Sequence, residues 1–322
     1  MSKTDTDMRL SSGIDSRIKG NLAIFSAKTF SGLNQNALKY LLPRWLDAPS
    51  GVFLRLLFGS AFFWILGWIR PDKNERVSAS DRIRLLLTGA ITVFGYMYCL
   101  LAGLTYTTPI SSSIFIALQA CVVYIICLCI GTEKLSPGRL AGLGLGIAGA
   151  LVCIFTQKHS DVASDPMLGN LFCLGSTVMF SAYLVIEKRF LRRLSNATVS
   201  KYTFTGGLAT AFAVLLAGGH WAAPVLSQNL ISAPVLVLAF VLVFPTGISY
   251  LLTDIGLKRL PATVVALYAN WILIVAAIAS YILGQDRFSW WQLLSIALMI
   301  ASVCLVEKAE GKPDQIDRPV RS

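Results

Sequence analysis

Long apolar stretches alternate with short polar ones along the whole chain. A helix that crosses roughly 30 Å of hydrocarbon needs about 20 mostly apolar residues, and ten runs of about that length occur in the sequence. They are residues 20–42, 50–69, 83–105, 109–131, 137–156, 168–187, 198–218, 234–256, 261–284 and 289–306. Since the connections are short, the pattern predicts an all-α membrane protein with ten transmembrane helices and no separate soluble domain.

Composition excludes the other broad classes of protein. Charged residues make up 14% of the 322 residues and apolar types 55%, whereas soluble proteins carry about 25% charged residues. The seven cysteines all lie inside apolar runs, which predicts packing residues and neither disulfides nor a metal site. Residues 1–19 lack the apolar core of a cleaved signal peptide, so the first run is predicted to be a retained span. Nothing in the sequence predicts a cofactor.

The distribution of positive charge predicts an orientation. With the N-terminus inside and ten spans, 22 of the 28 lysines and arginines fall on the cytoplasmic side and only three on the outer side. Such a bias is typical of multi-pass proteins. It predicts a chain that is surrounded by lipid and has both termini cytoplasmic. It also explains most of the net charge of +11 without a nucleic-acid partner.

Short matches at nearly constant spacing indicate an internal repeat. Residues 131–136 (GTEKLS) and 284–289 (GQDRFS) lie 153 positions apart. Two further matches are Gly103-Leu104 with Gly256-Leu257, at the same offset, and GNL at 20–22 with GNL at 169–171, an offset of 149 that also places Lys39 on Lys188. Matches in this order favour two related halves.

The repeat predicts the organisation of the chain. Two five-helix repeats span 20–156 and 168–307, joined by an outer linker at 157–167. A cytoplasmic N-terminal tail covers 1–19 and a C-terminal tail covers 308–322. Because five is odd, the second repeat must enter the membrane inverted, an arrangement that recurs in transporters.

These features together resemble the EamA-type permeases of the drug/metabolite transporter superfamily, over nearly all of 20–307. The residues that carry the resemblance are Gly131, Glu133, Lys134, Gly284, Asp286 and Arg287 at the ends of the fourth and ninth spans, Arg55 in the second, and the two Gly-Leu pairs. The resemblance implies a central cavity lined by spans 1–4 and 6–9. Together with the lack of organelle signals in the sequence, it also implies a location in the cell (inner) membrane. The chain departs from the family in having Gln119 and Asn270 near positions that are often proline, and Asp286 where glutamate is usual.

The first span is unusually polar for a transmembrane helix. At 100° per residue, Lys28, Gly32, Gln35 and Lys39 fall within roughly a 60° arc, and Asn36 flanks it. Polar and ionisable residues within spans usually face a cavity, so Lys28, Gln35 and Asn36 are candidate substrate-binding residues. Lys39 either joins them or extends to the outer interface. Gly32 is a candidate for close approach or gating.

Other spans add candidates. Arg55 lies near the outer end of the second span, where it binds an anionic group, pairs with Asp47 or positions the helix. Pro245 and Gly247 are candidate hinge residues, since proline removes a backbone donor. Aromatic and amide side chains that either bind a mixed polar and apolar solute or pack between helices are Tyr96, Gln119, Tyr250 and Asn270.

Acidic residues are scarce within the spans. Glu187 and Asp254 lie near cytoplasmic ends beside Lys188 and Lys258, and they read as boundary ion pairs or, alternatively, as proton carriers. With a basic centre at Lys28 and no carboxylate near mid-membrane, the pattern favours a solute that bears a carboxylate or phosphate.

A GxxxG pattern at Gly142 and Gly146 in the fifth span is typical of close helix packing. It serves either neighbours in the same bundle or a homodimer contact.

We therefore predict a secondary transporter, a permease or exporter of small metabolites. Amino acids or similar carboxylate-bearing solutes are the expected substrates, and alternating access is the expected mechanism. An organophosphate or nucleotide-sugar antiporter is the alternative, and a membrane receptor without transport is a third reading. An enzyme is not predicted, because no nucleophile and base or metal cluster occurs within the spans.

Overall fold

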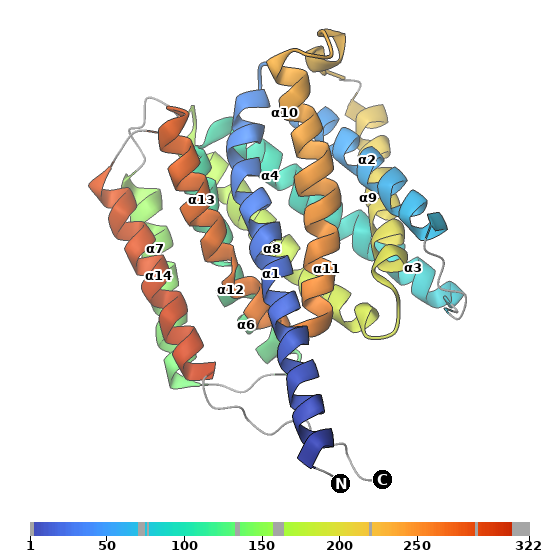
Figure 1. The fold of residues 1–322 in the computed structure, drawn as a ribbon. Coiled ribbons are helices and arrows are strands. Elements are labelled where there is room, and N and C mark those ends of the chain that lie inside the picture. Colours follow the sequence, from blue (N-terminus) through green and yellow to red (C-terminus); the bar gives the residue numbers. More distant parts are fainter. Residues whose placement is uncertain are drawn as a thin grey trace.

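In a computed structural model, the chain forms a bundle of helices (Figure 1). The structure describes residues 3–69, 75, 77–132, 136–156, 164–218, 221–286 and 289–310. Every regular element in these ranges is helical, which confirms the all-α prediction. Of the predicted segments, residues 157–163 of the linker, residues 311–322 of the C-terminal tail, and the motif residues Glu133, Lys134 and Arg287 lie outside the described residues.

In the first half of the chain, the described residues form eight consecutive helical segments. They are α1 (Lys3–Leu41), α2 (Ala48–Ile69), α3 (Ala79–Thr88), the π-helix η1 (Gly89–Val93), α4 (Phe94–Tyr106), α5 (Pro109–Ala117), α6 (Gln119–Cys129) and α7 (Pro137–Thr156). The first helix begins at Lys3, so the predicted N-terminal tail is already helical from there.

The described part of the second half contains nine helical segments. They are α8 (Pro166–Leu191), α9 (Asn196–Gly218), the 3₁₀-helix η2 (Pro224–Ser227), α10 (Ala233–Val241), the π-helix η3 (Leu242–Ile248), α11 (Ser249–Arg259), α12 (Ala262–Leu267), α13 (Ala269–Ile282) and α14 (Trp290–Glu310).

Seven helical stretches in the described part of the chain are long and apolar enough to cross a membrane. They are α2, α3 to α4, α5 to α6, α8, α9, α10 to α11, and α12 to α13. Shorter apolar stretches lie at Leu140–Gly149 in α7 and Trp290–Ser302 in α14. Helix α1 is not one of these seven stretches, because its many polar residues lower its hydropathy. The chain is therefore a multi-pass membrane protein, with seven stretches meeting the criteria of length and composition.

The two halves share the same irregularities. A π-helical turn lies before α4 and another before α11. An extended residue, Thr107 in one half and Leu260 in the other, then ends the helix just before a proline-containing turn. The next helix breaks again, at Leu118 and at Tyr268.

Glycines with positive φ end the corresponding helices α6 and α13. Gly131 has φ 77° and Gly284 has φ 64°, a conformation that side chains disfavour. The next backbone N–H then closes the helix in both halves, from Thr132 to Cys127 O and from Gln285 to Ser280 O, each at 2.9 Å. This is the helix-ending turn in which glycine is preferred, so it explains the glycine of the repeated motif.

The helix packing also occurs in matched pairs. Helix α1 packs on α11 and α13, and α8 packs on α4 and on α5 and α6. Helices α2 and α9 lie together on one side of the bundle, whereas α7 and α14 lie together at the opposite edge (Figure 1).

The glycines of the repeat lie where these helices cross. A Cβ atom at Gly169 of α8 would be 2.8 Å from Thr107 N and 2.9 Å from Gly103 O of the α4 segment. At the matching crossing, a Cβ at Gly256 of α11 would be 2.3 Å from Ile24 Cγ1 and 3.4 Å from Gly20 O of α1. The backbones therefore approach closely at two equivalent points.

The GxxxG pattern of α7 packs inside the chain. Ser302 of α14 donates to Gly142 O at 2.6 Å, and Ser295 donates to Gly149 O at 2.7 Å. A Cβ at Gly146 would lie 2.9 Å from Ser302 Oγ. Helix α14 of the same molecule therefore packs on this face of α7.

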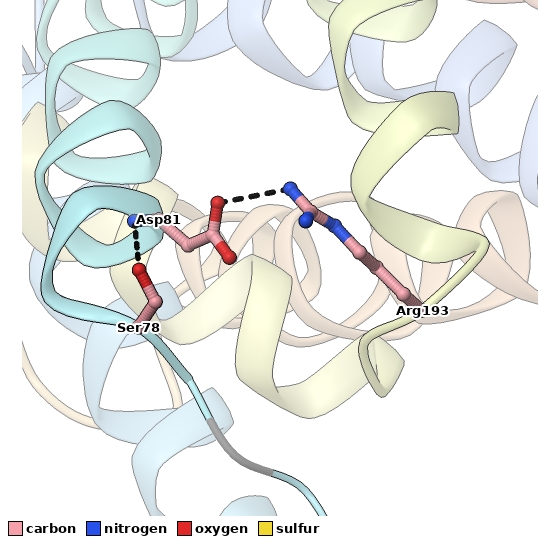
Figure 2. Close-up of polar contacts among 3 residues, drawn as sticks. All are labelled: Ser78, Asp81 and Arg193. Atoms are coloured by element: carbon pink, nitrogen blue, oxygen red, sulfur yellow. Dashed lines mark hydrogen bonds and ion pairs between the residues drawn. The ribbon is translucent and has the colours of Figure 1, made fainter.

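Polar groups tie the ends of the bundle. Figure 2 shows Arg193, in the turn after α8, reaching Asp81 in the first turn of α3, with N···O at 2.9 Å. Ser78 caps the same helix by accepting from Asp81 N at 3.4 Å. Because the Arg193 side chain is 57% exposed, the pair contributes little stability and mainly fixes the position of α3.

The crossings predict an effect of side-chain size. Replacing Gly169 with alanine places a methyl group against backbone atoms that cannot rotate away, and such overpacking costs about 1–3 kcal/mol. Thermal unfolding in detergent should show a lower Tm for Gly169→Ala, whereas Gly144→Ala, where no atom lies within 4 Å, should unfold near the wild-type temperature. Equal Tm values for the two variants would contradict the close crossing.

Candidate functional site

A small enclosed cavity of about 30 Å³ lies among the central helices. Its lining includes seven residues predicted from the sequence: Lys28, Gln35, Arg55, Tyr96, Gln119, Pro245 and Tyr250. The rest of the lining is Ser31, Asn34, Ile116, Phe180, Ser249, Thr253 and Ile272. These residues come from α1, α2, α4, α5, α6, α8, η3, α11 and α13. Among the described residues, α7, α9 and α14 contribute none.

Lys28 is the buried cation of α1. Its side chain is 2% exposed, and its ammonium lies 5.4 Å from the centre of the Phe180 ring of α8. Within the described part of the chain, no acidic side chain lines the cavity beside it. A buried cation without an acidic partner is costly, and the aromatic face supplies only part of the missing interaction.

Arg55 connects the cavity to the irregular turn η3. Its Nε donates to Thr246 Oγ1 at 3.0 Å, and that hydroxyl donates in turn to Val241 O at 2.9 Å. Pro245 has no N–H to offer the carbonyl four residues earlier, which is that of Val241. Thr246 therefore fills the bond that the proline removes. Asp47, by contrast, accepts from Ser50 N at 3.0 Å at the start of α2.

Arg55 also has spare donor capacity. It is 1% exposed, and its Nη1 has no hydrogen-bond partner among the described groups.

Amide groups occupy other positions on the cavity wall. Gln35 accepts from Ser112 Oγ at 3.2 Å, which joins α1 to α5. Asn34 Oδ1 and Gln119 Nε2 are buried without a hydrogen-bond partner among the described groups. Ser249 donates to Ala27 O at 3.1 Å and holds α11 against α1. The cavity thus presents both an unused acceptor and unused donors.

Lys39 lies away from this cavity, at a crossing. Its ammonium donates to Leu104 O at 3.0 Å and to Thr107 O at 2.7 Å, the free carbonyls at the end of α4. Lys188 does the same at the other crossing, donating to Leu257 O and Leu260 O at the end of α11. A lysine at a helix C-terminus satisfies its unpaired carbonyls.

Four other predicted residues also lie outside the cavity lining. Asn36 donates to Ala276 O of α13 at 3.1 Å, and Asn270 donates to Leu267 O at 2.8 Å, across the break before α13. A Cβ at Gly32 would lie 2.7 Å from Val275 Cβ, so this glycine allows α1 to approach α13. Gly247 lies in η3 beside Pro245.

The second repeat motif brings its acidic residue to the first half. Asp286 accepts from Ile110 N at the start of α5, at 3.3 Å, and from Gln292 Nε2 at 3.2 Å. Burial raises the pKa of the Asp286 carboxyl above its ordinary value, although hydrogen bonds and Lys39 oppose this.

Two features were not found from the sequence. Phe180 carries no signal that separates it from any other aromatic residue of a span. The second feature is the deep burial of Glu187 and Asp254, which are 1% and 0% exposed. Lys188 donates to backbone carbonyls, so the predicted ion pair of Glu187 with Lys188 is replaced by other contacts.

A second, open cavity of about 480 Å³ lies at the ends of α8, α11 and α12. It is lined by basic side chains: Arg17, Lys188, Arg189, Arg192 and Arg259. This surface attracts anions.

A bundle of apolar helices with matched halves and a buried polar cavity between them defines a multi-pass membrane transporter. A sequence model of the EamA-like transporter family matches residues 18–155 and again 167–307. The chain therefore belongs to the EamA-like transporter family, and it is a transporter, not an enzyme.

Relatives of known sequence are also transporters. The uncharacterized transporter YyaM of Bacillus subtilis is 22% identical over 276 residues, which cover 85% of this chain and 88% of YyaM. An uncharacterized transporter of Archaeoglobus fulgidus is 23% identical over 265 residues, covering 81% of this chain and 88% of the relative. The aromatic amino acid exporter YddG of Ancylobacter novellus is 26% identical over 168 residues, covering 52% of this chain and 56% of the exporter.

A solved crystal structure shares the fold. It superposes with a TM-score of 0.67 at 19% identity and covers 92% of this chain and 99% of the other.

The two crossing lysines predict a shared structural effect. In Lys39→Met or Lys188→Met, two carbonyls lose a charged donor, and a hydrogen bond to a charged group contributes about 1.5–3 kcal/mol. Each variant should therefore have a lower Tm in detergent. Lys201→Met, which removes a lysine stacked 5.1 Å from the Trp64 ring, is the matched control. A wild-type Tm in both crossing variants would show that the lysines do not hold the helix ends.

Proposed function

We propose that this chain is a secondary transporter of α-amino acids, with an aromatic amino acid as the first candidate solute. The observation that carries the proposal is the pair of buried cations, Lys28 and Arg55, on a cavity whose described lining holds no carboxylate. A substrate carboxylate would supply the missing negative charge, and such charge-assisted bonds are the strong ones.

The remaining groups of the cavity match the rest of an amino acid. Asn34 Oδ1, which has no partner among the described groups, would accept from the α-ammonium group. Phe180, Ile116 and Ile272 offer an apolar wall for the side chain. The name of the relative YddG, an aromatic amino acid exporter, supports the same solute class and export as the direction.

Transport requires opening, because a cavity of about 30 Å³ holds one or two waters and no amino acid. We propose ten spans arranged as two inverted repeats, with alternating access arising when the crossings α1 with α11 and α4 with α8 open in turn. Membership of the EamA-like transporter family supports a cell (inner) membrane location, and the bias of basic residues supports cytoplasmic termini.

An organophosphate or nucleotide-sugar antiporter is the second candidate. The open basic cavity around Lys188, Arg189 and Arg192 is the observation that favours it, since phosphates bind clustered arginines and lysines.

The amino-acid proposal is tested by counterflow in proteoliposomes. Labelled L-tryptophan should exchange with internal L-tryptophan, and tryptamine, which lacks the carboxylate, should not compete. In Lys28→Met, the apparent affinity for tryptophan should fall roughly ten- to hundredfold, since a lost hydrogen bond to a charged group costs about 1.5–3 kcal/mol.

Lys201→Met again serves as the matched control, because Lys201 is a lysine of α9 outside the cavity, and it should exchange like the wild type. Equal competition by tryptamine and tryptophan, or unchanged affinity in Lys28→Met, would refute carboxylate recognition by this lysine. Exchange of glycerol phosphate but not of tryptophan would favour the second candidate.

A further inference from the structure

Two carboxyl groups lie buried where α8, α9 and α11 meet. Glu187 of α8 is 1% exposed and Asp254 of α11 is 0% exposed. The Tyr183 hydroxyl donates to Glu187 Oε1, and Ser200 Oγ of α9 donates to Asp254 Oδ2 at 2.7 Å. Neither acid lines the central cavity, so the proposed solute site does not account for them.

The two carboxyl groups interact electrostatically with each other. Glu187 Oε2 and Asp254 Oδ1 are buried and have no hydrogen-bond partner among the described groups. Carboxylate oxygens only accept hydrogen bonds, so these two oxygens can bond to each other only when one of the carboxyl groups carries a proton. Two ionised carboxylates in contact, away from water, repel each other strongly.

The surrounding charges leave room for one proton. Lys258 is the cation that interacts electrostatically with Asp254. Tyr183 and Tyr250 are the other titratable groups that interact electrostatically with the two acids. Lys188, next to Glu187 in sequence, has its ammonium on Leu257 O and Leu260 O. One lysine and one proton together balance two carboxyl groups.

Other charged groups lie on the two flanks of the pair. Toward the central cavity, Lys28 lies over Phe180, and Arg55 and Tyr96 act on Tyr250. On the opposite flank lies the basic cavity with Lys188, Arg189 and Arg259.

The matching crossing shows that packing does not need these acids. With offsets of 149 and 153, Glu187 corresponds to Leu38 and Asp254 to Leu101. Both leucines are 0% exposed. The helix end near them is also capped by a lysine, Lys39, and also lies against a glycine, Gly169. Since leucines serve one crossing, the carboxyl groups at the other have a role beyond filling space.

The pair also lies between the two cavities. The Tyr183 ring, whose hydroxyl binds Glu187, is 5.9 Å from the Phe180 ring and 6.2 Å from the Tyr250 ring, and both of those rings line the central cavity. On the other side, Val185 and Lys188 line the open basic cavity. A shift of α8 or α11 at the central cavity would therefore change the environment of the two acids.

We propose that Glu187 and Asp254 form a proton-binding site that holds one shared proton and releases it toward the basic cavity when the α1 and α11 crossing opens. The proton moves between a carboxyl oxygen and water, and no other bond changes. Binding of the proton stands on its own. Coupling of that proton to transport rests on the proposed transport function.

Infrared spectroscopy of the purified protein tests proton binding without any solute. At neutral pH, the wild type should show the carbonyl stretch of a protonated carboxylic acid, and Glu187→Leu/Asp254→Leu, which copies the first crossing, should lose that band. Asp286→Asn, which removes a buried acid from a loop, should retain it. If the double leucine variant retains the full band, or if the wild type has none, the shared proton is refuted.

The double variant must be folded for this comparison to count. Its Tm in detergent is expected to match or exceed that of the wild type, because a buried polar pair is replaced by leucines. Should it fail to fold, Glu187→Gln/Asp254→Asn keeps the shape of both side chains, and the same loss of the band is required of it.

Transport by the same variants tests coupling. In proteoliposomes, a pH gradient should drive accumulation of labelled L-tryptophan by the wild type but not by Glu187→Gln/Asp254→Asn, while tryptophan exchange at equal pH is retained. Accumulation by the variant equal to that of the wild type would refute coupling. Absence of tryptophan exchange in the wild type would instead refute the proposed solute, and the infrared result would still decide proton binding.

Discussion

The close approach of helix backbones at two crossings is the constraint on which the rest of the structure depends. Gly169 against the α4 end and Gly256 against α1 leave no space for side chains. Lys39 and Lys188 reach the carbonyls at the ends of α4 and α11 from α1 and α8. The end of α4 is thus packed against Gly169 of α8 and capped by Lys39 of α1. The end of α11 is packed against α1 through Gly256 and capped by Lys188 of α8.

The central cavity has the opposite character. Lys28 and Arg55 are buried there, and Asn34 and Gln119 keep unpaired atoms among the described groups. Buried polar groups without partners destabilise a fold, and their occurrence together is typical of a binding site, where stability is lost in favour of function. The apolar clusters around the cavity, which include Leu38, Leu101 and Leu257, supply the compensating packing.

Much of this arrangement could be predicted from the sequence, because membrane helices leave two strong signals. The length of each apolar run predicts a span, and the 3.6-residue period placed Lys28 and Gln35 on one face, where the structure brings both to the cavity. The offset of the repeat already related Lys39 to Lys188. What the sequence does not contain is the geometry between helices. The contact of Glu187 with Asp254 depends on how α8 and α11 cross, and the break at Tyr268 has no proline or glycine to signal it.

The small size of the central cavity has a consequence for the membrane itself. A cell stores energy as ion gradients, and any continuous column of water through a transporter would dissipate them. With room for one or two waters in about 30 Å³, the cavity offers no such column. Aromatic and aliphatic side chains, among them Phe180 and Ile272, close its walls. In this form the central cavity itself therefore holds no column of water along which ions could cross.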